Sequence, residues 1–122
     1  MSNVTISTHV QNGIWVISLS GELTSQDGDA MSAVHPWLQP AVSTRVILFD
    51  MSGLSYINSA GIALLIRFVR ESRRREYTSY ACGVSAHYQK IFRIVGLTSY
   101  LELFPDAYSA FETLSARQAG GT

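Results

Sequence analysis

The sequence predicts an α/β domain in which a mixed, mostly parallel sheet of about five strands carries four helices, in the order ββαβαβαβα. The chain opens with two β-rich segments around Asn12-Gly13, the dipeptide most typical of a tight antiparallel hairpin. Later apolar runs alternate with segments of helical spacing, and such strand–helix–strand connections make neighbouring strands parallel. The 122 residues, 47% of them hydrophobic, suit one domain with one core.

The first half of the chain contains the hairpin, one helix and a buried strand. Alternating, β-branched residues predict strands at Val4–Val10 and Ile14–Leu19, followed by a polar loop over residues 20–27. A continuous apolar run predicts a central strand at Arg45–Asp50, buried on both faces. Between them we expect one helix that ends before Pro40, because helical spacing relates Ala30, Ala33, Val34, Trp37 and Leu38.

The second half alternates helices and strands. We expect helices at about 59–76 and 86–95, a last helix that starts after Asp106, and strands at 77–84 and 100–104. Gly96 is placed to end the second of these helices. We assign residues 1–115 to the domain and residues 116–122, which are small and polar, to a flexible C-terminal tail.

Composition narrows the class of protein. Zero net charge and a pI of about 6.8 argue against nucleic-acid binding, which needs a basic surplus. No apolar run reaches the length of a membrane span, and the first residues lack the pattern of a signal peptide, so we expect no membrane insertion. The single cysteine, Cys82, excludes an internal disulfide. Together these features favour a cytoplasmic protein.

A search for catalytic residues finds no constellation. The Gly-x-Ser-x-Gly elbow of hydrolases is absent, and His9, His35 and His87 fall in separate predicted elements. No histidine or cysteine spacing suits a metal, and no glycine-rich loop suits a nucleotide cofactor. We therefore expect a non-enzymatic protein without cofactor, and keep a small hydrolase using Ser59 as the enzyme alternative.

The segment around Ser59 is the most informative. Residues 51–58 form a long polar loop between the buried strand and the next helix. Asn58 or Ser59 can cap that helix, and its positive end favours an anion, including a phosphate on the serine. Ala60 and Gly61 are small and leave the hydroxyl open to an approaching protein. A plain helix cap and a modified serine both fit this pattern.

The helix after Ser59 has three distinguishable faces. A stripe that should face the sheet consists of Ile62, Leu65, Ile66 and Val69. Leu64 and Phe68 lie on the far side, and a third face carries Arg67, Arg70 and Arg74. Either Leu64 and Phe68 pack under a neighbouring helix beside solvated arginines, or they form an apolar partner-binding pair with an arginine rim.

The segment Asp50–Ile62 resembles the signature of STAS domains, and within them of bacterial anti-sigma factor antagonists. That family shows a strand-terminal Asp-x-Ser, a short apolar loop, and Asp-Ser-(Ser/Thr/Ala)-Gly at the start of a helix. Leu19–Leu23 is similar to the family's Leu-x-Gly-Glu-Leu, and Ile91–Leu97 to the end of its third helix. The resemblance runs from Val4 to Leu114 and implies a single STAS-like domain.

The resemblance also implies a mechanism. Such an antagonist binds an anti-sigma factor that is a serine kinase, and so frees a sigma factor for transcription. The kinase phosphorylates the serine that matches Ser59 and inactivates the antagonist, and a PP2C-type phosphatase reverses this. A dimer is among the assemblies we consider. The residues expected to bind the partner are Gly21, Glu22, Asn58, Ser59, Ala60, Gly61, Leu64, Arg67 and Phe68.

Asn58 departs from the family pattern, because many members have Asp at that position. Asn keeps the capping role and loses the charge. The alternative function is therefore a STAS scaffold or accessory subunit, in a stress-signalling complex or beside a transporter, that is not phosphorylated.

Overall fold

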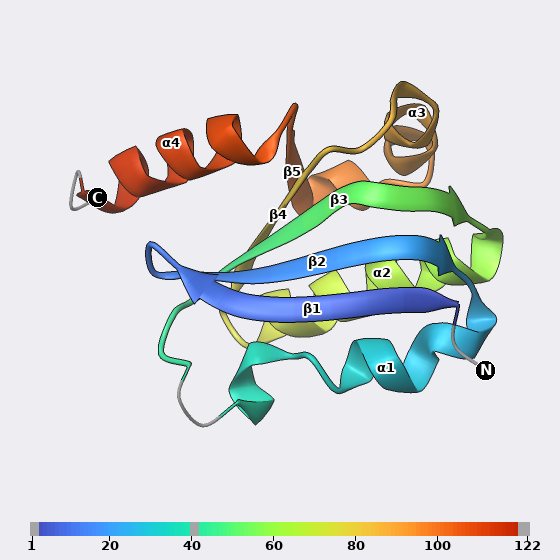
Figure 1. Cartoon of the computed structure of the whole chain (residues 1–122), viewed down its shortest axis with the longest axis horizontal. Coiled ribbons are helices and arrows are strands. Elements are labelled where there is room, and N and C mark those ends of the chain that lie inside the picture. Colours follow the sequence, from blue (N-terminus) through green and yellow to red (C-terminus); the bar gives the residue numbers. More distant parts are fainter. Residues whose placement is uncertain (1–2, 40–41, 120–122) are drawn as a thin grey trace.

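A mixed five-stranded sheet forms the centre of the computed structural model, which describes residues 3–39 and 42–119 (Figure 1). The strands lie side by side in the order β1-β2-β3-β4-β5; only the β1–β2 pair is antiparallel, and the other pairs are parallel. This confirms the mixed, mostly parallel sheet. The strands are β1 (Val4–Gln11), β2 (Ile14–Leu23), β3 (Val46–Ile57), β4 (Thr78–Cys82) and β5 (Leu101–Phe104).

Helices cover both faces of the sheet. Helices α1, α2 and α3 contribute to one core cluster, whereas α4 packs on the opposite face through Ala110 and Leu114 (Figure 1). None of the helices in the described ranges is long and apolar enough to cross a membrane. In these ranges the α-helices are α1 (Gly28–Ser32), α2 (Ser59–Arg74), α3 (Ala86–Ile94) and α4 (Ala107–Ala119), which confirms the expected number and order.

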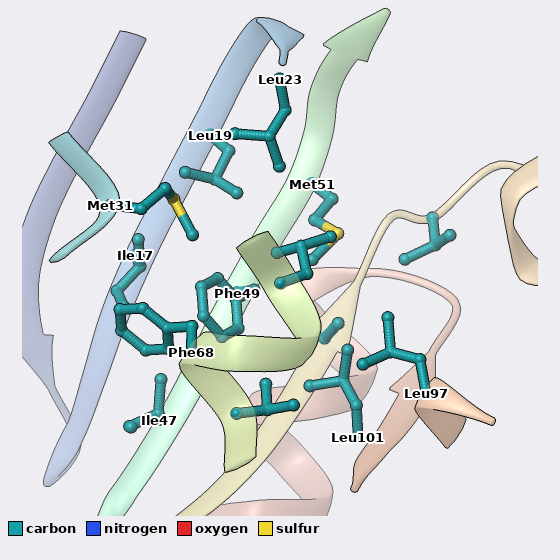
Figure 2. Packing of buried hydrophobic residues seen from close by; sticks show 14 of the residues in the cluster. Ile17, Leu19, Leu23, Met31, Ile47, Phe49, Met51, Phe68, Leu97 and Leu101 are labelled. Atoms are coloured by element: carbon teal, nitrogen blue, oxygen red, sulfur yellow. The ribbon is translucent and has the colours of Figure 1, made fainter. Parts of the chain in front are cut away.

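The main core lies between the sheet and α2. Figure 2 shows Ile17 of β2, Phe49 of β3 and Phe68 of α2 directed into the same space, with Met31 of α1 closing one side. Each of the four side chains is at most 3% exposed. Full burial of such a side chain is worth about 1.5–3 kcal/mol, so this cluster anchors α2 on the sheet.

The two central strands are longer than the sequence predicted. β2 continues to Leu23 and β3 to Ile57, through segments that we expected to be loops. Their parallel pairing survives two register shifts, where glycines allow close approach. Gly21 has a φ of +91°, and a Cβ on Gly53 would lie 2.7 Å from the Ser20 Cβ. The polar composition of residues 50–56 therefore marks a solvated strand edge.

The helix expected over residues 30–38 is also different. α1 ends at Ser32, and a separate 3₁₀ turn, Pro36–Leu38, follows it. His35 has an extended backbone, because a residue before proline is pushed out of the helical region. The Trp15 indole N–H donates to the Val34 carbonyl at 2.9 Å and holds the turn on β2. Pro40, the expected end of the helix, lies outside the described residues.

The other boundaries agree with the prediction to within two residues, except at the C-terminus. α4 runs to Ala119, so residues 116–119, which we assigned to the flexible tail, are helical. Arg117 in this last turn pairs with Glu102 of β5 at 3.2 Å. The remaining residues of the expected tail, 120–122, lie outside the described part of the chain.

Candidate functional site

Ser59 is the first residue of α2, and a single residue, Asn58, separates it from β3. Asn58 is the helix cap: its side-chain oxygen accepts from the Gly61 N–H at 2.8 Å. The long loop that we expected before Ser59 is absent, because its residues belong to β3. Ser59 therefore lies between the end of a strand and the start of a helix, and its backbone is held more rigidly than it would be in a loop.

The end of β2 is fixed against the same helix start. The Leu23 carbonyl accepts from the Asn58 N–H at 3.2 Å. A Cβ on Gly61 would lie 2.2 Å from that carbonyl oxygen, so only glycine fits there. The structure thus brings six residues expected in the site to the carboxyl ends of β2 and β3: Gly21, Glu22, Asn58, Ser59, Ala60 and Gly61.

The Ser59 side chain is exposed, and its hydroxyl group is not engaged in a hydrogen bond with the described residues. Among the described residues its hydroxyl has no hydrogen-bond partner, and the first turn of α2 contains no acidic side chain. The helix N-terminus carries a partial positive charge of about half a unit, which favours an anion. An additional negative charge on Ser59 would therefore be tolerated by the fold.

Phe68 is not part of this surface, which corrects the expected site. Its side chain is 3% exposed, stacks on His35 at a ring-centroid distance of 3.8 Å and meets the Phe49 ring edge-on at 5.2 Å. Leu64 is half-buried and lies against Gly28 of α1. For Phe68 the interpretation as packing under a neighbouring segment is confirmed, because α1 and the turn after it cover that side of α2. The place of half-buried Leu64 in a partner-binding surface stays a prediction.

The arginines of α2 are exposed, as expected. Arg74 forms an ion pair with Glu71 at 3.3 Å, and Arg75 forms another with the same carboxylate. Arg67 lies at the rim of a hollow of about 320 Å³ between α1 and α2, away from Ser59 by two helical turns. Its place in a partner-binding surface stays a prediction.

His35 contributes a feature that sequence reasoning missed. Its ring is stacked between Trp37, at a centroid distance of 4.1 Å, and Phe68. Burial among these rings lowers the pKa of His35 to about 4, so the imidazole is neutral near pH 7. The contact joins segments more than thirty residues apart, and no local pattern signals it.

Asp27, in the segment that we expected to be a polar loop, connects two parts of the chain. The side chain is fully buried and accepts from the backbone N–H groups of Asn3, Val4 and Thr24 at 2.8–3.4 Å. It thereby ties the start of β1 to the turn that follows β2. The pattern Thr24-x-x-Asp27, a capping box, was the available signal.

The groups that a catalytic serine would need are engaged elsewhere. The Asp50 carboxylate accepts from the Ser52 hydroxyl at 2.7 Å and lies roughly 20 Å upstream of Ser59 along β3. His9 hydrogen-bonds Gln11, and His87 meets Tyr88 edge-on. Within the described ranges no three potential ligands gather into a metal site. The arrangement leaves the Ser59 side chain exposed at the start of α2.

Comparison with known proteins places this geometry in a family. The model of the STAS domain matches residues 5–110. A Bordetella bronchiseptica protein, BtrV, described as a candidate anti-sigma factor antagonist, is 26% identical over 80% of this chain and 81% of its own. The anti-sigma-B factor antagonist of Staphylococcus aureus is 26% identical over 83% of this chain and 93% of its own.

Solved structures share the fold. The Bacillus cell fate determinant SpoIIAA in its phosphorylated form has a TM-score of 0.64 at 22% identity, covering 90% of this chain and 99% of that one. A sulfate transporter family protein from Wolinella succinogenes has a TM-score of 0.73 at 18% identity, covering 89% and 92%. Both similarities concern the fold.

Proposed function

The chain belongs to the STAS domain family, and we propose that it acts there as an anti-sigma factor antagonist, switched off by phosphorylation of Ser59. In this proposal it binds an anti-sigma factor that is a serine kinase and thereby releases a sigma factor in the cytoplasm. The names of its relatives in Bordetella and Staphylococcus support the functional class.

The observation that carries the proposal is the setting of Ser59. An exposed hydroxyl without a partner among the described residues stands at the positive end of a sixteen-residue helix. Its neighbour Ala60 is small and half-buried, which leaves a kinase active site room to approach. A buried or hydrogen-bonded serine would have to be pulled out of the structure before it could react.

The expected effect of the phosphate follows from its charge. Phosphorylation adds about −1.5 to −2 charge at neutral pH. The helix end stabilises that charge by about 0.3–1 kcal/mol, so the domain stays folded. A partner that buries the neutral hydroxyl must instead desolvate the phosphate, which is far more costly. Loss of binding therefore requires no refolding.

The partner surface is proposed to be centred on the two strand ends and the first turn of α2. Glu22 and Ser59 are exposed there, and Gly21, Asn58 and Ala60 are half-buried. Leu64 and Arg67 extend the surface toward α1. The exposure of Ser59 also suits reversal of the switch by a PP2C-type phosphatase.

A second function, an unphosphorylated scaffold or accessory subunit, is favoured by one observation. Asn58 stands where many family members carry Asp, and its amide serves as the helix cap. A neutral amide cannot assist proton removal from the serine or contribute charge to kinase recognition. If the kinase depends on that carboxylate, Ser59 stays unmodified.

The test is incubation of the protein with an anti-sigma factor serine kinase and ATP, followed by mass spectrometry. The proposal expects one phosphate, located on Ser59 and absent from Ser59→Ala. Asn58→Asp is the matched variant, because it restores the family's carboxylate and keeps the cap. If only the Asn58→Asp variant is phosphorylated and the parent protein is not, the scaffold function is favoured. If the kinase binds both proteins and phosphorylates neither, the proposed phosphorylation switch is wrong.

A further inference from the structure

An open apolar groove lies between α2 and α3, next to Ser59. Its volume is about 400 Å³. The Tyr88 hydroxyl of α3 accepts from the Ile57 N–H at 2.9 Å, which fixes α3 beside the end of β3 and keeps the groove open. The residues that line the groove are Ile57, Ser59, Ile62, Ala63, Ile66, Ile91 and Val95.

The rim of the groove on α3 is also apolar. Val95, which lines the groove, is 45% exposed, and its sequence neighbour Ile94, the last residue of α3, is 77% exposed. Only 15% of the chain is charged, compared with about 25% in an average soluble domain. A cluster of exposed β-branched side chains around a hollow is typical of a binding surface.

Unpaired positive charge borders the groove on the α2 side. A second hollow, of about 330 Å³, shares Ala63 and Ile66 with the groove and is also lined by Arg67, Arg70, Glu71 and Arg74. Among the described residues, neither Arg67 nor Arg70 has an ion pair, whereas Arg74 is paired with Glu71. The two guanidinium groups are one turn apart and free to bind carboxylates on a partner.

We infer that this groove binds one amphipathic helix of a partner protein, with an apolar stripe seated between α2 and α3 and an acidic flank on Arg67 and Arg70. Helix-in-groove binding uses apolar residues spaced one turn apart, which matches Ile62 and Ile66 on α2 facing Ile91 on α3. The flank charge follows from the unpaired arginines, because a basic flank would meet like charge.

The same charges disfavour a second copy of this chain as the occupant. A two-fold symmetric contact through the groove pairs the same surface of both copies. It would bring the arginine rows of two α2 helices close together in a partly desolvated interface. An acidic helix from a different protein carries no such penalty.

If the proposed function holds, the bound helix belongs to the anti-sigma factor; this identification of the partner rests on the proposed function. Ser59 lines the same groove, so a phosphate on it would place negative charge at the end of an apolar site and near an acidic helix. The groove itself, and the chemistry of the helix that fits it, follow from the described side chains alone.

The test uses synthetic peptides on the intact protein. One probe is an 18-residue helical peptide with leucines one turn apart and glutamates on the flank. The control peptide has the same sequence with lysines at the glutamate positions. Methyl NMR should show the glutamate peptide shifting the Ile62, Ile66 and Ile91 signals. We expect it to bind at least about tenfold more tightly than the lysine peptide, with less discrimination in high salt.

Charge reversal provides the variant arm. Arg67→Glu/Arg70→Glu should reverse the peptide preference, whereas Arg45→Glu/Arg117→Glu, which changes the net charge equally and lies away from the groove, should preserve it. Thermal midpoints confirm that both variants fold. Equal binding of the two peptides, shifts confined to another face, or self-association through the groove would each overturn the inference.

The outcome is separable from that of the proposed function. A kinase that binds and phosphorylates Ser59 without shifting the groove methyl signals would leave the function standing and remove the inference. Peptide discrimination with no kinase binding would support the groove and count against the anti-sigma assignment.

Discussion

The backbone N–H of Asn58 donates to the carbonyl oxygen of Leu23 at 3.2 Å, and this bond joins the end of β2 to the start of α2. Gly21 and Glu22 directly precede Leu23, so they lie at the same end of the sheet as Ser59. The position of Ser59 therefore depends on the backbone of two strands. Variants that disturb this junction should lower both the stability of the protein and its ability to bind a partner.

Gly61→Ala should disrupt the junction. The new Cβ would lie 2.2 Å from the Leu23 oxygen, a backbone atom that cannot move aside without shifting β2. We expect a loss of about 3 kcal/mol in the free energy of unfolding, measured by chemical denaturation.

Gly28→Ala is the matched control for this substitution. Its Cβ would meet the Leu64 side chain at an ordinary 3.6 Å, and its φ of −58° is helical. We expect it to leave stability unchanged or raise it by up to about 1 kcal/mol. Equal losses in the two variants would mean that the close approach of Gly61 to Leu23 is not what makes glycine necessary.

His35→Phe should flatten the loss of stability in acid. The folded pKa of His35 is about 4, below the usual 6.5, because burial disfavours the charged ring. The unfolded chain therefore takes up the proton first, and stability present above pH 6.5 is lost as the pH falls toward 4.

Between pH 7 and pH 4.5 the parent protein should lose on the order of 1–2 kcal/mol more unfolding free energy than His35→Phe. The figure is this small because the ring is only half-buried. Phenylalanine keeps the stack with Trp37 and Phe68, and the other two histidines stay in place. Urea denaturation at pH 7 and pH 4.5 measures the difference. If the stability of the two proteins changed equally with pH, the assignment of His35 as a half-buried imidazole that is neutral in the folded protein would be refuted.

The sequence predicted the sheet and its helices because their patterns are local. Apolar runs, the Asn12-Gly13 turn and helix spacing are each read within a few residues. Phe68 was misplaced because its burial depends on His35 and the turn after α1, which no local spacing encodes. The strand extension through Gly53 was missed because the sequence there is polar, and only pairing with β2 makes it a strand.

The candidate site was partly predictable for the same reason. Asn58, Ser59 and Gly61 form one contiguous capping motif, so their relation could be anticipated. The close approach of Leu23 to Gly61, and the position of Ile66 and Ile91 in one groove, depend on how separate elements pack. These long-range contacts decide which exposed residues share one surface.

Phe68→Ala should be far more costly than changes at its neighbours on α2. We expect a loss of about 3–5 kcal/mol in unfolding free energy, because the ring fills the core between Phe49 and His35. Leu64→Ala, at a half-buried site, should cost about 1–2 kcal/mol, and Arg70→Ala less than about 0.5 kcal/mol. Similar losses for Phe68→Ala and Arg70→Ala would contradict the assigned packing of α2.

Cys82 should be inert in the folded protein. Burial, with further contributions from Asp50 and Asp106, raises the pKa of its thiol to about 12 from the usual 9.0. The thiolate fraction at pH 8 is then lower by about a thousandfold. A thiol reagent should react at least that much more slowly in buffer than in guanidinium.

The same shift predicts how stability changes in base. A thiol whose folded pKa is raised contributes stability that is complete below pH 9 and declines as the pH rises toward 12. Cys82→Ala should reduce that decline. Rapid labelling of native protein at pH 8 would show that the thiol is accessible and contradict its placement under α4.

The most direct measurement for the central claim compares kinase binding by the unmodified and Ser59-phosphorylated protein, using calorimetry, with the thermal midpoint of each form. We predict that phosphorylation weakens binding at least about 100-fold, because the phosphate must lose its water at the interface, while the midpoint changes little. Equal affinities of the two forms, with the phosphate verified on Ser59, would contradict the account.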